Sequence, residues 1–153
     1  MRWPNVLGCL TLLLSVPAVA QERPADNMNL VREKVRADKK LLVAENMGMT
    51  EAEAKAFWPV YDAYQADLGK LNDRTLRLIQ DYAANYQAMT DATASRMLDE
   101  FVAIERDRAS LLQSYRPRFG AVLSASKVAR YYQIENKIRA VLNYELAAHI
   151  PLM

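Results

Sequence analysis

Two consecutive stretches of this chain, residues 51–89 and 91–119, carry stripes of mainly apolar residues, most of them three or four positions apart. This heptad spacing is the pattern of coiled-coil packing. Strand patterns and tight hairpin turns are absent from the sequence, and the abundant alanine, leucine, arginine, glutamate and lysine favour helix. The two stripes are Phe57, Tyr61, Tyr64, Leu68, Leu71, Thr75, Leu78, Tyr82 and Met89, then Met97, Phe101, Ile104, Arg108, Leu111, Tyr115 and Phe119.

The start of the second helix is marked by a capping box. The Thr50 hydroxyl can accept from the amide of Glu53, whose carboxylate can reach back to the Thr50 amide. Gly48 is a natural stop for a preceding helix over residues 28–47. Pro59 lies inside the second helix, removes one backbone donor and should kink the helix there.

Two further helices follow. The third starts near Thr90 or Asp91, and Pro117 and Gly120 bend or end it. Ser124 is the expected N-cap of the fourth. Because the connection between the second and third helices is short, these two should run antiparallel. We predict an all-α fold of four helices, in which N- and C-terminal helices flank a long antiparallel hairpin.

Arg108 occupies one position of the second apolar stripe. A polar residue in a helical seam can fix the register of the two helices. We expect either that Arg108 pairs with an acid across the hairpin, such as Asp67 or Asp73, or that the seam opens to solvent there.

Residues 1–20 have the form of a signal peptide. A positively charged start precedes an apolar run over residues 6–16, and small residues at Ala18 and Ala20 fit a signal-peptidase site. The run is shorter than the roughly 20 residues that span a bilayer. We predict cleavage after Ala20, a single mature helical domain over residues 21–153, a periplasmic location and no stable membrane insertion.

Cys9 is the only cysteine in the chain. It follows Leu7 and Gly8 as in a lipoprotein cleavage box, so lipidation of Cys9 stays an alternative. However, it lies at the start of the apolar run and not after it. We expect Cys9 to be removed with the leader, which would leave the mature chain with neither a disulfide nor a thiol.

Catalytic and metal-binding patterns are weak. His149 is the only histidine and lies close to the last residue of the sequence, and no glycine-rich phosphate loop occurs. Glu145 and His149 are four residues apart and could hold one ion, but a full site needs three or four ligands. Met47 and Met49 could attract copper(I), although packing is their commoner role. We predict no enzymatic activity, no cofactor and no metal site.

The last third of the chain is basic. Residues 111–153 hold two acids, Glu135 and Glu145, against six lysines and arginines. This charge permits attraction to acidic partners. It falls short of the strongly basic surface that nucleic-acid binding requires, so we expect no nucleic-acid partner.

The starts of the second and fourth helices share one form, in which a large apolar residue precedes a hydroxyl cap. The residues at these starts are Met49, Thr50 and Glu53, then Leu123, Ser124 and Lys127. In an exported helical chain of this size, the layout resembles the Spy/CpxP family of periplasmic proteins, which carry paired LTxxQ motifs. Thr50 and Leu123 match that motif, whereas Glu53 and Lys127 stand where it has glutamine.

The resemblance implies a thin, curved helical homodimer that cradles unfolded or stress-damaged envelope proteins without ATP. Long exposed apolar stripes also favour self-association. Related members of that family restrain a sensor kinase, and some bind metal. A signalling partner that docks on an acidic sensor, or a metal-responsive protein, is therefore the alternative to a chaperone.

Basic and aromatic residues near the end of the third helix and along the fourth are the candidates for client binding. Arginine and aromatic side chains suit adaptable interfaces. The alternative is that the arginines form a solvated face and the aromatic rings lie in the core. The candidates are Arg116, Arg118, Phe119, Arg130, Tyr132, Lys137 and Arg139.

Overall fold

The structure is a computed structural model that describes residues 28–152, with side chains from residue 36 onward. The predicted signal peptide, Cys9 and the cleavage position after Ala20 lie outside the described residues. The described residues form four α-helices and one short 3-10 helix: α1 (Met28–Met47), α2 (Glu51–Asn85), η2 (Tyr86–Ala88), α3 (Asp91–Gly120) and α4 (Ala125–His149). The predicted all-α class is confirmed for this part of the chain.

The chain divides into two compact units, Met1–Asp38 and Lys39–Met153. Of the first unit, only the initial part of α1 is described. The second unit contains the rest of α1 and the other helices. The long hairpin and the hydrophobic core both belong to this second unit.

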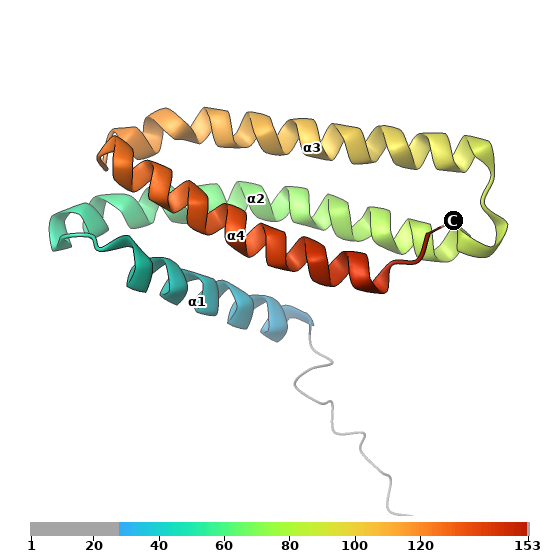
Figure 1. Cartoon of the computed structure of the whole chain (residues 1–153), viewed down its shortest axis with the longest axis horizontal. Helices are drawn as coiled ribbons and strands as arrows, with labels where there is room; N and C mark the ends of the chain where they lie inside the picture. The colour runs from blue at the N-terminus through green and yellow to red at the C-terminus, as the bar shows by residue number, and fades with distance from the viewer. Residues whose placement is uncertain (1–27, 153) are drawn as a thin grey trace, which may run out of the picture. The chain divides into compact units, whose positions relative to one another are not determined.

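The predicted hairpin is confirmed, since α2 and α3 pack against each other in opposite directions (Figure 1). The two helices are 35 and 30 residues long and are joined through η2. Both continue through their internal prolines, Pro59 and Pro117, so neither proline ends a helix. Gly120 is the last residue of α3, and the amide of Ala121 still donates to the Pro117 carbonyl at 3.0 Å.

The predicted capping box opens α2. The Thr50 hydroxyl accepts from the Glu53 amide at 3.2 Å, and the Glu53 carboxylate accepts from the Thr50 amide at 2.8 Å. Gly48 has a φ of 55°, a left-handed conformation that favours glycine. This residue therefore ends α1 and turns the chain into α2, as the sequence indicated.

Hydroxyl caps also start the next two helices. Thr90 accepts from the amide of Thr93 at 3.2 Å, and Ser124 accepts from the amide of Lys127 at 3.4 Å. Each cap satisfies one of the amides that a helix start leaves without an intrahelical partner. The Ser124 cap agrees with the prediction, and Thr90 lies where the third helix was expected to start.

The hydrophobic core lies at one end of the hairpin, where α1 leads into α2 and α3 leads into α4; we call this the closed end. Phe57 of α2, Phe119 of α3 and Tyr131 of α4 are all fully buried. Their ring centroids lie 4.8 to 5.7 Å apart. The other members of this cluster are Val43, Met47, Tyr61, Tyr64, Leu68, Tyr115, Leu123 and Val128.

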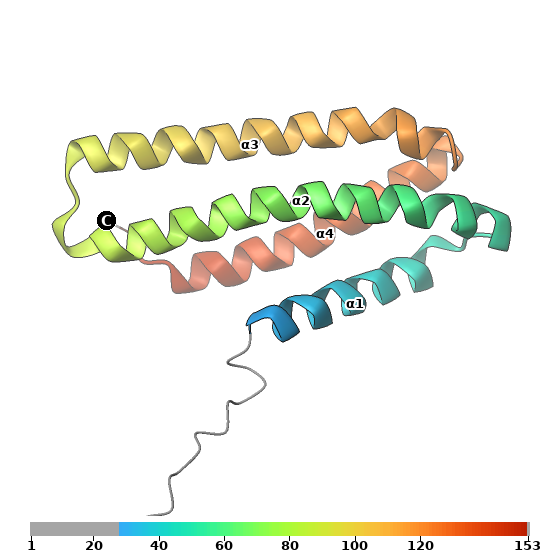
Figure 2. The same cartoon turned by 180° about the vertical axis from the view of Figure 1, so that it is seen from behind.

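Toward the other end of the hairpin, near η2, apolar side chains become exposed; we call this the open end. Phe101 was predicted in the helical seam but has 53% of its surface exposed. Val141 and Leu142 of α4 are likewise 62% and 53% exposed. The reason is the path of α4, which crosses the hairpin obliquely (Figures 1 and 2) and is exposed at every residue from Arg139 to His149.

Arg108 lies in the seam, with 11% of its side chain exposed. Its partner across the hairpin is the amide oxygen of Asn72 at 3.3 Å, whereas we had expected an acid or an opening to solvent. Ion pairs that join α2 to α3 are made by Arg74, which contacts Glu100 at 2.9 Å and Asp107 at 2.7 Å. Another is made by Arg96, which lies 3.6 Å from Asp81. These contacts fix the register of α2 against α3.

Substitution Phe119→Ala should destabilise the fold by about 3–5 kcal/mol, the range for emptying a buried aromatic site. Phe101→Ala removes the same ring from a half-exposed position of the same helix and should have a much smaller effect. Urea unfolding followed by circular dichroism measures both. Equal losses in the two variants would contradict the placement of the core at the closed end.

Candidate functional site

The two helix starts that carry the family resemblance meet at the closed end. The Glu53 carboxylate and the Lys127 ammonium lie 2.5 Å apart, so the two positions where the LTxxQ motif has glutamine form an ion pair. The apolar residues of the two starts also share one environment, because Leu123 is in the core and Met49 packs against it. The predicted motif positions therefore come together and tie the start of α2 to the start of α4.

The ion pair has an electrostatic consequence. The hydrogen bond from Lys127, followed by that from the Thr50 amide, holds the pKa of Glu53 below its usual value. The carboxylate thus stays ionised at neutral pH, where it caps one helix and holds another. The pair joins the first turn of α2 to the first turn of α4 and so fixes the two helix starts relative to each other.

The predicted client-binding residues of α3 do not share one face. Arg116 and Arg118 are two residues apart, a spacing that points side chains to different sides of a helix. Both are exposed. The Arg118 guanidinium lies over the ring of Tyr115, 4.5 Å from its centroid. Tyr132 of α4 is half-buried and donates a hydrogen bond from its hydroxyl to the Leu112 carbonyl at 3.0 Å. Burial raises the pKa of Tyr132, and the nearby charge of Arg116 opposes this rise only in part.

The basic residues of α4 are also divided. Arg130 and Lys137 are seven residues apart, so they share one exposed face. Arg139 is two residues from Lys137, a spacing that places it on another side of the helix. Burial lowers the pKa of Arg108 of α3, the charge of Glu105 opposes this, and the charge of Arg139 adds to it. The structure therefore separates the predicted basic patch into several smaller surfaces.

Phe119 is the one predicted client-binding residue that the structure removes from the surface. Its side chain is fully buried between Phe57 and Tyr131. A ring in this position cannot contact a client without unfolding the closed end. The aromatic-core alternative therefore applies to Phe119.

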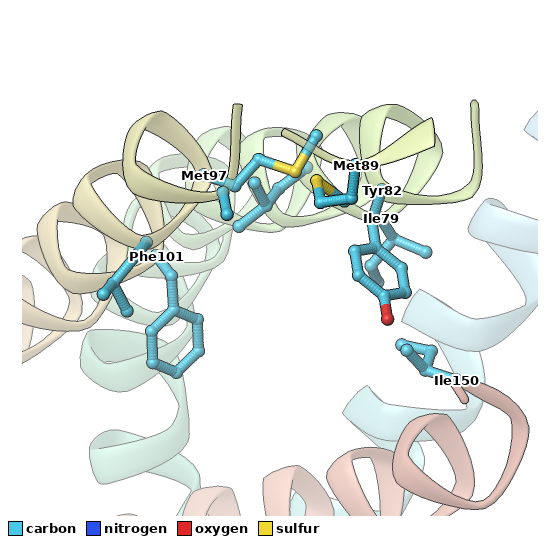
Figure 3. A pocket seen from close by; sticks show the side chains of 9 residues that line it. Ile79, Tyr82, Met89, Met97, Phe101 and Ile150 are labelled. Atoms are coloured by element: carbon cyan, nitrogen blue, oxygen red, sulfur yellow. The ribbon is translucent and has the colours of Figure 1, made fainter. Parts of the chain in front are cut away.

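A hollow that the sequence reasoning did not identify lies at the open end, between α2 and α3. It is open to solvent, has a volume of about 260 Å³, and its surface is almost entirely apolar. The side chains of Phe101, Tyr82 and Ile150 surround the same open space (Figure 3). The lining residues are Leu78, Ile79, Tyr82, Met89, Ala94, Met97, Leu98, Phe101 and Ile150.

Leu98 is the sequence signal that could have indicated this hollow. Heptad packing explains Met97 and Phe101, but Leu98 and Val102 widen the apolar stripe beyond a seam. Leu98 and Val102 are 61% and 56% exposed. Because the apolar stripe is wider than the surface that the partner helix can cover, part of it stays open to solvent.

The inner face of α4 extends the apolar surface. Leu142 lies seven residues after Glu135 and fourteen after Val128, both of which are buried, so all three share one face of the helix. Nevertheless, Leu142 is 53% exposed and Leu146 is 41% exposed. The face that packs at the closed end is therefore uncovered in the second half of α4.

The described residues give no evidence of a metal centre or a membrane span. Within them, no group of three or more histidine, cysteine, aspartate or glutamate side chains could hold an ion. None of the described helices is long and apolar enough to cross a bilayer. Comparison with protein-family models, curated proteins and solved structures finds no match.

Substitution Glu53→Gln should make the stability of the protein less sensitive to acid. Glutamine keeps an acceptor for the Thr50 amide but loses the charge that Lys127 contacts. Because the folded-state pKa of Glu53 lies below its usual 4.5, its contribution is complete above that value and is lost as the pH falls through the lowered pKa. Wild type should therefore melt higher than the variant near neutral pH, and the difference should shrink toward about pH 3.

Thermal melts monitored by circular dichroism measure this difference. Glu51→Gln is the matched control, because Glu51 is an exposed acid in the same helical turn. A constant gap between wild type and Glu53→Gln at all pH values would show that the ion pair does not stabilise the fold.

Proposed function

We propose that this protein is an exported, ATP-independent, chaperone-like protein of the periplasm that holds non-native or stress-damaged envelope proteins. The observation that carries the proposal is the apolar surface at the open end. It is formed by the hollow between α2 and α3 together with the uncovered inner face of α4. The predicted signal peptide and the resemblance to the Spy/CpxP family support the same function.

The chemistry of the open end suits varied apolar segments. Leu98 and Phe101 remain largely exposed in the folded chain, and contiguous apolar surface of this kind marks interaction sites. Met89 and Met97 line the hollow, and the flexible thioether side chain adapts to differently shaped partners. Burial of such surface on binding would supply the driving force.

The rigid closed end would allow this surface to bind without a change of fold. Its aromatic core and the Glu53–Lys127 pair hold the helices in place. Clients would then be held by contact alone, with no turnover and no cofactor. Self-association into a homodimer is part of the proposal and would bury further apolar surface on α4.

The exposed pair of Arg130 and Lys137 on α4 favours a second candidate function. Two cations on one helical face can attract an acidic sensor domain. Such a complex would be selective for one partner and would weaken with salt. Apolar binding of many clients would be less sensitive to salt.

The exported protein should suppress the aggregation of a chemically denatured model protein at near-stoichiometric ratios, as measured by light scattering. The double variant Leu98→Ser, Phe101→Ser should lose most of this effect, because it removes the largest exposed apolar groups of the open end. Suppression by wild type should persist in high salt.

The double variant Leu41→Ser, Val141→Ser is the matched control. These residues are 59% and 62% exposed, close to the 61% and 53% of Leu98 and Phe101, but lie outside the hollow. If the two double variants lose the suppression of aggregation to the same extent, this would contradict a client site at the open end. Failure of wild type to suppress at any salt concentration would favour the dedicated sensor partner.

A further inference from the structure

The hollow at the open end already contacts a short piece of the chain. Residues 150–152 follow α4, and Ile150 lines the hollow beside Tyr82 and across from Phe101 (Figure 3). Ile150 has an extended backbone conformation, with φ −94° and ψ 112°, as expected of a residue before proline. The apolar surface is therefore partly covered by an extended aliphatic segment.

Two tyrosines hold this segment through its main chain. The Tyr82 hydroxyl donates to the Pro151 carbonyl at 2.9 Å, and the Tyr86 hydroxyl donates to the Leu152 carbonyl at 3.0 Å. The two rings contact each other, with centroids 5.7 Å apart. Carbonyl acceptors occur in every polypeptide, so these bonds do not depend on which side chains the segment carries.

We propose that the hollow is a binding site for extended apolar polypeptide segments and that residues 150–152 occupy it as an intramolecular competitor. An aliphatic side chain enters the hollow, and the two following carbonyls accept from Tyr82 and Tyr86. The inference rests on the proposed chaperone-like function, since it names the client feature that is recognised: an aliphatic residue in extended chain, with free main-chain acceptors.

The competitor is attached in a way that permits displacement. The neighbouring half of α4, from Arg139 to His149, is exposed throughout, and the Leu152 side chain is 89% exposed. The Ile150 side chain and two hydrogen bonds at exposed positions hold the segment against the hollow, while the Ile150 amide donates to the Leu146 carbonyl of α4 at 3.0 Å. A client segment of the same chemistry can therefore replace it while the closed end stays folded.

The test uses fluorescence anisotropy of a fluorescein-labelled peptide that copies residues 146–152, titrated with the exported protein. Ile150→Ser frees the hollow and should bind the peptide about fivefold or more tightly than wild type, because apparent affinity rises with the fraction of open sites. Adding Tyr82→Phe to Ile150→Ser should weaken binding again, since one hydroxyl donor is lost.

Val141→Ser is the matched control, because it exchanges a β-branched aliphatic residue for serine on α4 outside the hollow. It should bind the peptide as wild type does. Equal affinity of Ile150→Ser and wild type would overturn the inference, even if wild type suppresses aggregation. Tighter peptide binding by Ile150→Ser, without suppression of aggregation by any variant, would instead support the site and refute the chaperone-like function.

Discussion

The aromatic cluster of Phe57, Phe119 and Tyr131 is the contact on which the rest of the structure depends. It joins α2, α3 and α4 at one point, and Val43 and Met47 of α1 complete it. Edge-to-face and tilted aromatic pairs add about 0.5–1.5 kcal/mol each to the effect of burial. Because the cluster lies at one end of a long hairpin, it determines which part of the molecule is packed and which is left open.

A half-buried polar network borders this cluster and reinforces it. The Lys39 ammonium lies 2.7 Å from the Glu135 carboxylate, and Gln65 accepts from Lys39 and donates to both Glu135 and the Tyr131 hydroxyl. Burial and the charge of Glu135 raise the pKa of Tyr131. A buried carboxylate is tolerated only when it is paired and hydrogen-bonded, so this network requires α1, α2 and α4 to meet in one arrangement.

The helices and their starts could be predicted from the sequence because they depend on local chemistry. Thr50 and Ser124 cap helices through bonds to residues three positions ahead, and Gly48 turns the chain by its own conformation. The ion pair between Glu53 and Lys127 could not be predicted, because it joins residues 74 positions apart. Such contacts follow from the packing of α4, which no local pattern specifies.

The same distinction explains the errors at the open end. Heptad spacing shows which residues of α3 share a face, and Phe101 does lie on the face of Arg108 and Tyr115. Spacing does not show how far along that face α4 covers the hairpin. The buried part of α4 ends at Glu135, so Phe101 is left uncovered. For Phe119 two sequence indications differed: the heptad stripe placed it in the seam, whereas the nearby arginines suggested a surface. Its contact with Phe57 places it in the core.

The uneven distribution of packing has a physical consequence for binding. A chain that buries its aromatic residues at one end retains its fold when the apolar surface at the other end is exposed or covered. The free energy of binding is then not spent on folding the binding site, which is the general advantage of a preorganised surface. In the proposed function, burial of Leu98 and Phe101 by a client would therefore contribute to binding directly, reduced by the cost of displacing Ile150.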